Sequence, residues 1–102
     1  MTLRQRQSVF ALKITILIQY IYSMGYSVTY GDAARMDRKG HKKNSAHYSR
    51  LAKDLNLFDK NGRYLRKTED HRLFGEFWKF LGGIWGGDFE DPDGNHYEWP
   101  RR

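Results

Sequence analysis

The sequence predicts a small α+β domain in which helices pack on a small antiparallel sheet. Two stretches carry apolar residues at three- and four-residue intervals, which is typical of amphipathic helices, and several short runs are rich in aromatic and β-branched residues, as strands are. These elements do not alternate regularly as strand–helix–strand units, so a parallel α/β sheet is not expected. With 102 residues, the chain is expected to form a single domain over residues 1–102.

The first helix is predicted over residues 4–24. Its apolar positions fall on one helical face and are Phe10, Ile14, Leu17, Ile18 and Ile21. Gly25 is expected to end the helix. The apolar segment Val9–Tyr22 imitates a signal peptide, but Lys13 and Gln19 interrupt it and no small-residue cleavage site follows. A membrane span needs about 20 apolar residues, so we expect a buried helix instead.

The predicted strands come next in the chain. Residues 26–30 (YSVTY) and 51–58 (LAKDLNLF) are typical of strands, and Asn61-Gly62 predicts a hairpin turn into a returning strand over 63–65. Residues 96–99 could form a short closing strand. The polar, basic segment 36–44 is expected to be an exposed loop.

The second helix is predicted to begin after Thr68 as its N-cap, because two carboxylates follow in the first turn. Its predicted buried stripe contains Leu73, Phe74, Phe77, Trp78 and Leu81. Gly82-Gly83 is expected to end it. His41 and His71 fit no ligand pattern, so we expect them on a loop and on a helix surface.

Composition and charge limit the possible functions. The chain has 18 Lys and Arg against 12 Asp and Glu, a net charge of +6, yet 39% of its residues are apolar, which excludes a disordered polycation. A basic nucleic-acid-binding module is one alternative, although the aromatic residues fall mostly on predicted buried faces. The absence of Cys excludes disulfides and thiolate metal sites, so a metal would need His and carboxylate ligands.

Two histidines and two carboxylates offer such a set. His47, Asp54 and His96 could supply the three nitrogen and oxygen ligands of a catalytic zinc site that keeps one position open for water. Asp93 lies three residues before His96 and could act on that water as a general base without being a ligand.

Three segments resemble a known family. Residues 45–58 (SAHYSRLAKDLNLF), 82–99 (GGIWGGDFEDPDGNHYEW) and 19–35 (QYIYSMGYSVTYGDAAR) are similar to the zinc peptidases of the D-alanyl-D-alanine carboxypeptidase and L-alanyl-D-glutamate endopeptidase group, especially its small phage-type lysins. In this family Ser-x-His, followed seven residues later by Asp, supplies two zinc ligands. A C-terminal Asp/Glu-x-x-His supplies the base and the third ligand. The resemblance covers nearly the whole chain.

The resemblance implies the α+β fold of Hedgehog and DD-peptidase domains, with one Zn²⁺ ion on the sheet. The site residues that it implies are the zinc ligands His47, Asp54 and His96, the base Asp93, and the substrate-binding residues Arg35 and Ser45. Arg35 would pair its guanidinium with a substrate carboxylate. Ser45 would make a polar contact near the site.

Two departures from the family pattern stand out. Arg50 occupies a position where many members have glycine, and the segment 91–96 (DPDGNH) is looser than the compact Asp-x-Pro-His of other members. Asp91 therefore competes with Asp93 for the role of base.

The function expected from this resemblance is a zinc metallopeptidase that hydrolyses an amide bond in the stem peptides of bacterial peptidoglycan. We expect an L-alanyl-D-glutamate endopeptidase, a bacteriophage endolysin for cell-wall degradation, with D-alanyl-D-alanine carboxypeptidase as the alternative within the family. A monomer without a nucleic-acid partner or stable membrane insertion is expected. It would be made in the cytoplasm of a bacterial host, without a clear signal peptide, and act on the cell wall or in the periplasm.

Overall fold

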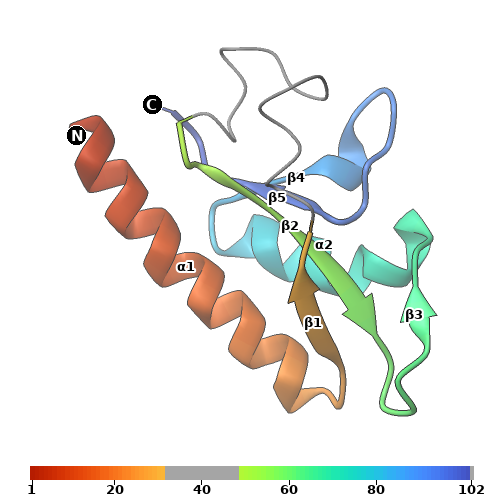
Figure 1. Ribbon diagram of the computed structural model, residues 1–102. Helices are drawn as coiled ribbons and strands as arrows, with labels where there is room; N and C mark the ends of the chain where they lie inside the picture. The colour runs from red at the N-terminus through yellow and green to blue at the C-terminus, as the bar shows by residue number, and fades with distance from the viewer. Residues whose placement is uncertain (32–48, 102) are drawn as a thin grey trace.

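The computed structural model describes residues 1–31 and 49–101 of the chain (Figure 1). Their elements are α1 (Leu3–Ser23), β1 (Ser27–Tyr30), β2 (Ala52–Phe58), β3 (Tyr64–Leu65), the 3-10 helix η3 (Thr68–His71), α2 (Arg72–Phe80), β4 (Ile84–Trp85), the 3-10 helix η4 (Gly86–Asp88) and β5 (His96–Glu98). Helices and an antiparallel sheet in this order confirm the predicted α+β class. The predicted loop over 36–44 lies outside the described residues.

The sheet is built around β2, which passes through its middle (Figure 1). The strand order is β1-β2-β5-β4, with β3 also paired to β2, and all described pairs are antiparallel. The C-terminal half of β2 pairs with β1, while its N-terminal half pairs with β5. Strand β2 is therefore hydrogen-bonded both to a strand from the N-terminal part of the chain and to a strand from its C-terminal part.

Helix α1 begins and ends at clear signals. Thr2 accepts a hydrogen bond from the Gln5 backbone N–H (3.1 Å) and donates its own backbone N–H to the Gln5 side chain (2.8 Å), which is a capping box. Gly25 follows the helix with φ +91°, a conformation that favours glycine. The predicted apolar face is confirmed, and its buried residues are Phe10, Ile14, Leu17 and Ile21. Within the described residues, we find no helix with the length and hydropathy needed to cross a membrane.

Helix α2 differs from the prediction at two points. Thr68 is not the N-cap of the α-helix, because the 3-10 helix η3 comes first and the Lys67 backbone N–H donates to the Asp70 carboxylate (3.1 Å). Leu73 was predicted to be buried but is 47% exposed. Gly75 takes the inward place instead, since the indole ring of Trp85 lies where a side chain at Gly75 would stand. The backbone of α2 at Gly75 thus packs directly against the Trp85 ring.

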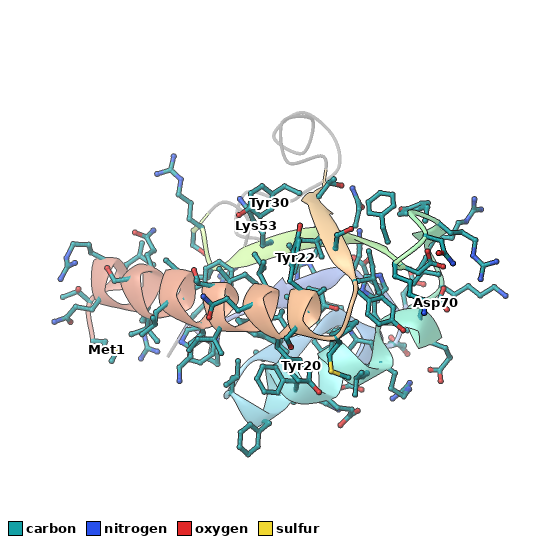
Figure 2. The ribbon with its side chains drawn as sticks, turned by 90° about the horizontal axis from the view of Figure 1, so that it is seen from below. Met1, Tyr20, Tyr22, Tyr30, Lys53 and Asp70 are labelled. Atoms are coloured by element: carbon teal, nitrogen blue, oxygen red, sulfur yellow. The ribbon has the colours of Figure 1, made fainter. Side chains whose placement is uncertain are left out.

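The core lies between the two helices and one face of the sheet. Its fully buried large side chains are Trp78, Trp85, Tyr97, Phe74, Leu17, Ile21, Leu51, Leu55 and Leu57. Aromatic contacts join the helices: Tyr20, labelled in Figure 2, stacks on Phe77 with 4.1 Å between ring centroids. Because side chains alternate along a strand, the residues between the core residues of β2 and β5 point to the opposite face of the sheet.

His71 was predicted to lie on the helix surface, and this is wrong. The side chain is 2% exposed, and its Nδ1 lies 2.9 Å from the Tyr97 hydroxyl in the core. Burial lowers the pKa of His71 to about 4, against the opposing effects of the Asp70 charge and a hydrogen bond to the Leu65 backbone. Burial also raises the pKa of Tyr97. A neutral imidazole whose Nδ1 accepts a hydrogen bond from the Tyr97 hydroxyl satisfies both groups.

Candidate metal centre

Strand pairing places Asp54 beside His96. The two residues are direct partners in the antiparallel register of β2 and β5, so their side chains leave the sheet on the same face. They are 42 positions apart in the chain, yet the Asp54 Oδ1 atom lies 3.3 Å from His96 Nδ1. The neighbouring residues Leu55 and Tyr97 point the other way, into the core. The alternation that buries the core therefore also places this pair on the opposite face of the sheet.

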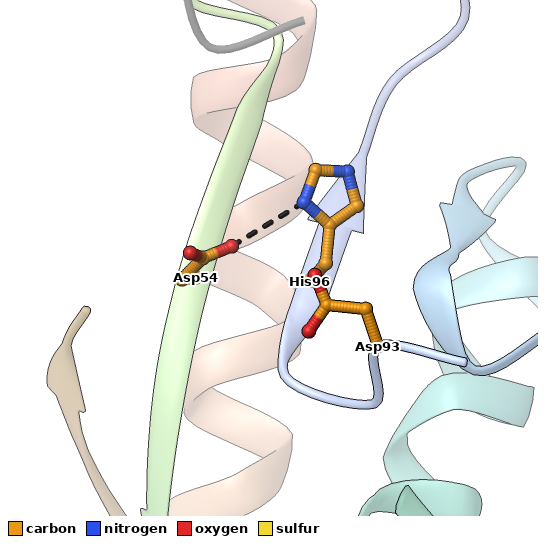
Figure 3. Close-up of side chains that lie close together, drawn as sticks. All are labelled: Asp54, Asp93 and His96. Carbon is orange, nitrogen blue, oxygen red and sulfur yellow. Dashed lines mark hydrogen bonds and ion pairs between the residues drawn. The ribbon is translucent and has the colours of Figure 1, made fainter. Parts of the chain in front are cut away.

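The turn before β5 brings a second carboxylate, Asp93, to the same place (Figure 3). The Asp93 backbone N–H donates to the Gly86 carbonyl (2.9 Å), and the Asp93 carbonyl accepts from the His96 N–H (3.1 Å). The indole N–H of Trp85 donates to the Gly94 carbonyl (2.8 Å), which ties the turn to the core. A side chain at Gly86 would overlap the Asp93 carbonyl, so the turn can sit this close only over glycine.

Asp54, Asp93 and His96 offer three possible ligand atoms that lie within 4.8 Å of one another. Two carboxylates and one imidazole are nitrogen and oxygen donors of the kind that Zn²⁺ binds, so the residues fit a zinc ion by their chemistry. Among the described residues this cluster contains Asp93 and not Asp91. The geometry therefore favours Asp93 over its sequence competitor.

His96 lies between two carboxylates. Its Nδ1 faces Asp54, and its Nε2 lies 2.7 Å from Glu98 Oε1. Burial by itself would lower the pKa of His96, but hydrogen bonds and charge interactions with Asp54 and Glu98 outweigh it and raise the pKa to about 9. A metal ion that binds this imidazole must displace a proton, since only the neutral ring has a free lone pair.

The other predicted site residues have different outcomes. Arg35, Ser45 and His47 lie outside the described residues, so their roles stay predictions. Arg50, which stands where many relatives have glycine, has a positive φ of 57°. Arg50 thus adopts the left-handed backbone that glycine adopts most readily.

Glu98 is not among the site residues expected from the sequence. The pattern that produces its hydrogen bond to His96 is nevertheless visible there. Residues two apart on a strand lie on the same face, so a glutamate two positions after His96 is within reach of the ring once the segment forms β5.

Comparison with known proteins agrees with this architecture. The sequence model of a family described as D-alanyl-D-alanine carboxypeptidase matches residues 39–99. The fold is similar to the crystal structure of the L-Ala D-Glu endopeptidase ChiX from Serratia marcescens, with a TM-score of 0.62 and 21% sequence identity over 96% of this chain and 83% of that chain. No curated protein sequence matches the chain. The family match spans more than half of the chain, including the strands that carry Asp54 and His96, and we conclude that the protein belongs to the D-alanyl-D-alanine carboxypeptidase family of peptidases.

Proposed function

We propose that the protein is a zinc-dependent L-alanyl-D-glutamate endopeptidase that hydrolyses the stem peptides of bacterial peptidoglycan. The observation that carries this proposal is the cluster of Asp54, Asp93 and His96 on the face of the sheet opposite the core, in a chain of this peptidase family. His47, which the family resemblance groups with Asp54 and His96, would complete the set of protein ligands for one ion.

The roles of the residues follow from their chemistry. Zinc, when bound, would supply a Lewis acid that polarises the scissile carbonyl and acidifies water. Asp93 would accept a proton from the attacking water as its oxygen bonds to the carbonyl carbon. The same carboxyl group would then give that proton to the leaving amine as the C–N bond breaks. With two imidazoles and one carboxylate as ligands, the ion would not need Asp93 as a ligand.

Substrate recognition is assigned to residues outside the described ranges. Arg35 would bind a carboxylate of the stem peptide through two parallel hydrogen bonds, which sets the register of the scissile bond. Ser45 would make a polar contact beside it. Both assignments rest on the family resemblance of the segments that contain them.

Endopeptidase activity is supported by the similarity of fold to ChiX, an L-Ala D-Glu endopeptidase, over most of both chains. D-alanyl-D-alanine carboxypeptidase is the second candidate, because the description of the matching family names that activity. The resemblance to small phage lysins supports a role in cell-wall lysis after synthesis in a bacterial host. The monomeric state and the passage to the wall stay predictions.

Mass spectrometry of purified peptidoglycan incubated with the protein tests the proposal. The digest is run with added zinc, with chelator, and with chelator followed by zinc. Fragments that disappear with chelator and return with zinc would support a zinc peptidase. Cleavage between L-Ala and D-Glu exposes a new D-Glu amino group, whereas a carboxypeptidase releases free D-Ala.

Two variants make the test specific. His96→Ala should lose both zinc and activity, and Glu90→Gln, which changes an exposed side chain in the same C-terminal region, should keep both. If the folded, zinc-loaded chain releases no fragment under any condition, the catalytic proposal is wrong.

A further inference from the structure

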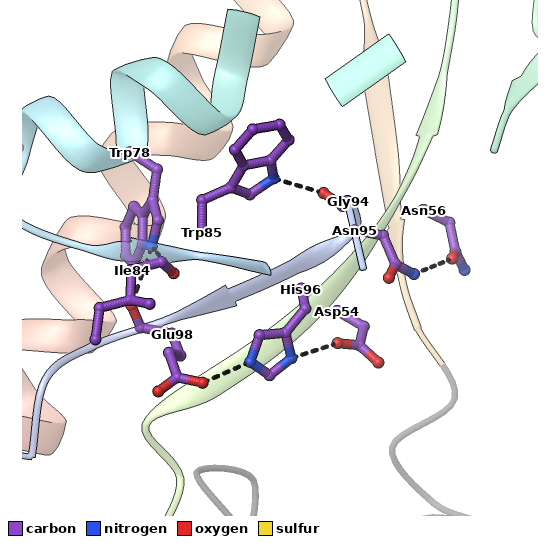
Figure 4. Close-up of polar contacts among 9 residues, drawn as sticks. All are labelled: Asp54, Asn56, Trp78, Ile84, Trp85, Gly94, Asn95, His96 and Glu98. Carbon is purple, nitrogen blue, oxygen red and sulfur yellow. Dashed lines mark hydrogen bonds and ion pairs between the residues drawn. The ribbon is translucent and has the colours of Figure 1, made fainter. Parts of the chain in front are cut away.

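The two ring nitrogens of His96 have separate carboxylate partners (Figure 4). Nδ1 lies 3.3 Å from Asp54 Oδ1, a long contact, whereas Nε2 lies 2.7 Å from Glu98 Oε1, the distance of a strong charge-assisted hydrogen bond. The side chains of His96 and Glu98 are 10% and 22% exposed, so the shorter contact is largely shielded from water. The ring is therefore held mainly from its Nε2 side.

Glu98 itself has a rigid backbone position. It lies in β5 between two strands, opposite Ala52 of β2 and Ile84 of β4. Its carbonyl accepts a hydrogen bond from the indole N–H of Trp78 (3.0 Å), a side chain that is fully buried. Figure 4 shows Trp78 on the helix side of β5, with the Glu98 carboxylate and the His96 ring on the other side. The core thus fixes the residue that contacts His96.

We infer that Glu98 is a positioning residue that presents His96 Nδ1 as the metal-binding nitrogen. This inference rests on the proposed function, because it assumes that His96 is a metal ligand. An imidazole that binds a metal through one nitrogen carries its proton on the other, and an acceptor at that second nitrogen fixes both the tautomer and the ring orientation. The Glu98 carboxylate is such an acceptor at Nε2.

The same geometry separates Glu98 from the role of base. Its carboxylate contacts the ring nitrogen opposite the one that faces Asp54. Glu98 therefore acts through His96 and not on the attacking water. Asp93, which belongs to the cluster of possible ligand atoms, keeps the role of base.

Zinc affinity of the whole chain, measured by competition with a chelator of known affinity, provides the first test. Glu98→Ala should weaken zinc binding by about 10- to 100-fold, the usual effect of removing the partner of a metal-binding histidine. Glu98→Gln should stay close to the unchanged chain, because the amide oxygen still accepts the Nε2 proton. Glu90→Ala removes one negative charge from an exposed position and should have no effect.

Histidine NMR of the zinc-loaded chain gives a second readout that does not depend on activity. In the unchanged chain and in Glu98→Gln, the His96 ring should show a metal-bound Nδ1 and a slowly exchanging Nε2 proton. In Glu98→Ala that proton should exchange rapidly with water. Glu98→Met, which keeps the side-chain volume without a good acceptor, replaces the alanine variant if the latter does not fold.

The outcomes separate this inference from the proposed function. If Glu98→Ala and Glu98→Met bind zinc as tightly as the unchanged chain and keep the slow Nε2 proton, the inference is wrong while zinc binding stands. If Glu98→Gln loses as much zinc affinity as Glu98→Ala, the negative charge of Glu98 strengthens zinc binding and its hydrogen-bond acceptor does not. This result would also overturn the inference. If the unchanged chain binds no zinc, both the inference and the proposed function fail.

Discussion

The buried His71 should make the stability of the fold sensitive to mild acid. Burial lowers the pKa of His71 from 6.5 to about 4, so the unfolded chain takes up a proton at a higher pH than the folded chain does. Stability from this group is therefore complete above pH 6.5 and is lost as the pH falls towards about 4. A shift of this size corresponds to about 3 kcal/mol, since one pKa unit is worth about 1.4 kcal/mol.

The variant His71→Gln removes the titration while keeping an amide that can bond to Tyr97. We expect the unchanged chain to lose about 2–3 kcal/mol more of its free energy of unfolding than the variant does between about pH 7.5 and about pH 4.5. Urea unfolding of both chains at the two pH values, without metal, measures this difference. Both chains share all other titrating groups, so their contributions cancel.

The comparison with His71→Gln is necessary because His96 changes the free energy of unfolding with pH in the opposite direction. Its pKa is raised to about 9 in the folded, metal-free chain, so its contribution is complete below 6.5 and is lost as the pH rises through about 9. Acidification therefore gains stability at His96 while it loses stability at His71. If the two chains show the same pH dependence, or if His71 titrates near 6.5 by NMR in the folded chain, the reasoning from its burial is refuted.

Three further changes test the site and the backbone around it. Gly86→Ala places a methyl group against the Asp93 carbonyl. It should lower the free energy of unfolding in urea by about 1–3 kcal/mol and weaken zinc binding. Unchanged stability and zinc affinity would contradict the close approach of the Asp93 carbonyl to Gly86. Asp93→Asn should lower turnover of peptidoglycan by about 10²- to 10⁴-fold with zinc retained, while Asp91→Asn should not; the reverse result would move the base to Asp91. Arg50→Gly removes the strain of a positive φ and should stabilise the fold by up to about 1 kcal/mol. Arg66→Gly, at an exposed arginine without a positive φ, should destabilise the fold. Equal effects of the two variants on stability would refute the strain at Arg50.

Local sequence signals predicted most of the elements because each depends on neighbours in the chain. The apolar period of α1, the Asn61-Gly62 turn and the alternation of β2 all appear in the structure close to their expected bounds. The exceptions have tertiary causes. Leu73 was expected in the core, but Gly75 lets Trp85 occupy that side of α2, and the helix buries a different set of residues.

For the candidate site, the sequence by itself determined which residue types are present and, through family resemblance, named Asp54, Asp93 and His96. The tertiary structure alone decided that these three come together and that Asp93 and not Asp91 joins them. It also decided that His71 is buried against Tyr97, which lies 26 residues away. These contacts depend on the register of β2 against β5 and on the packing of the core beneath it, and both join residues that lie far apart in the chain.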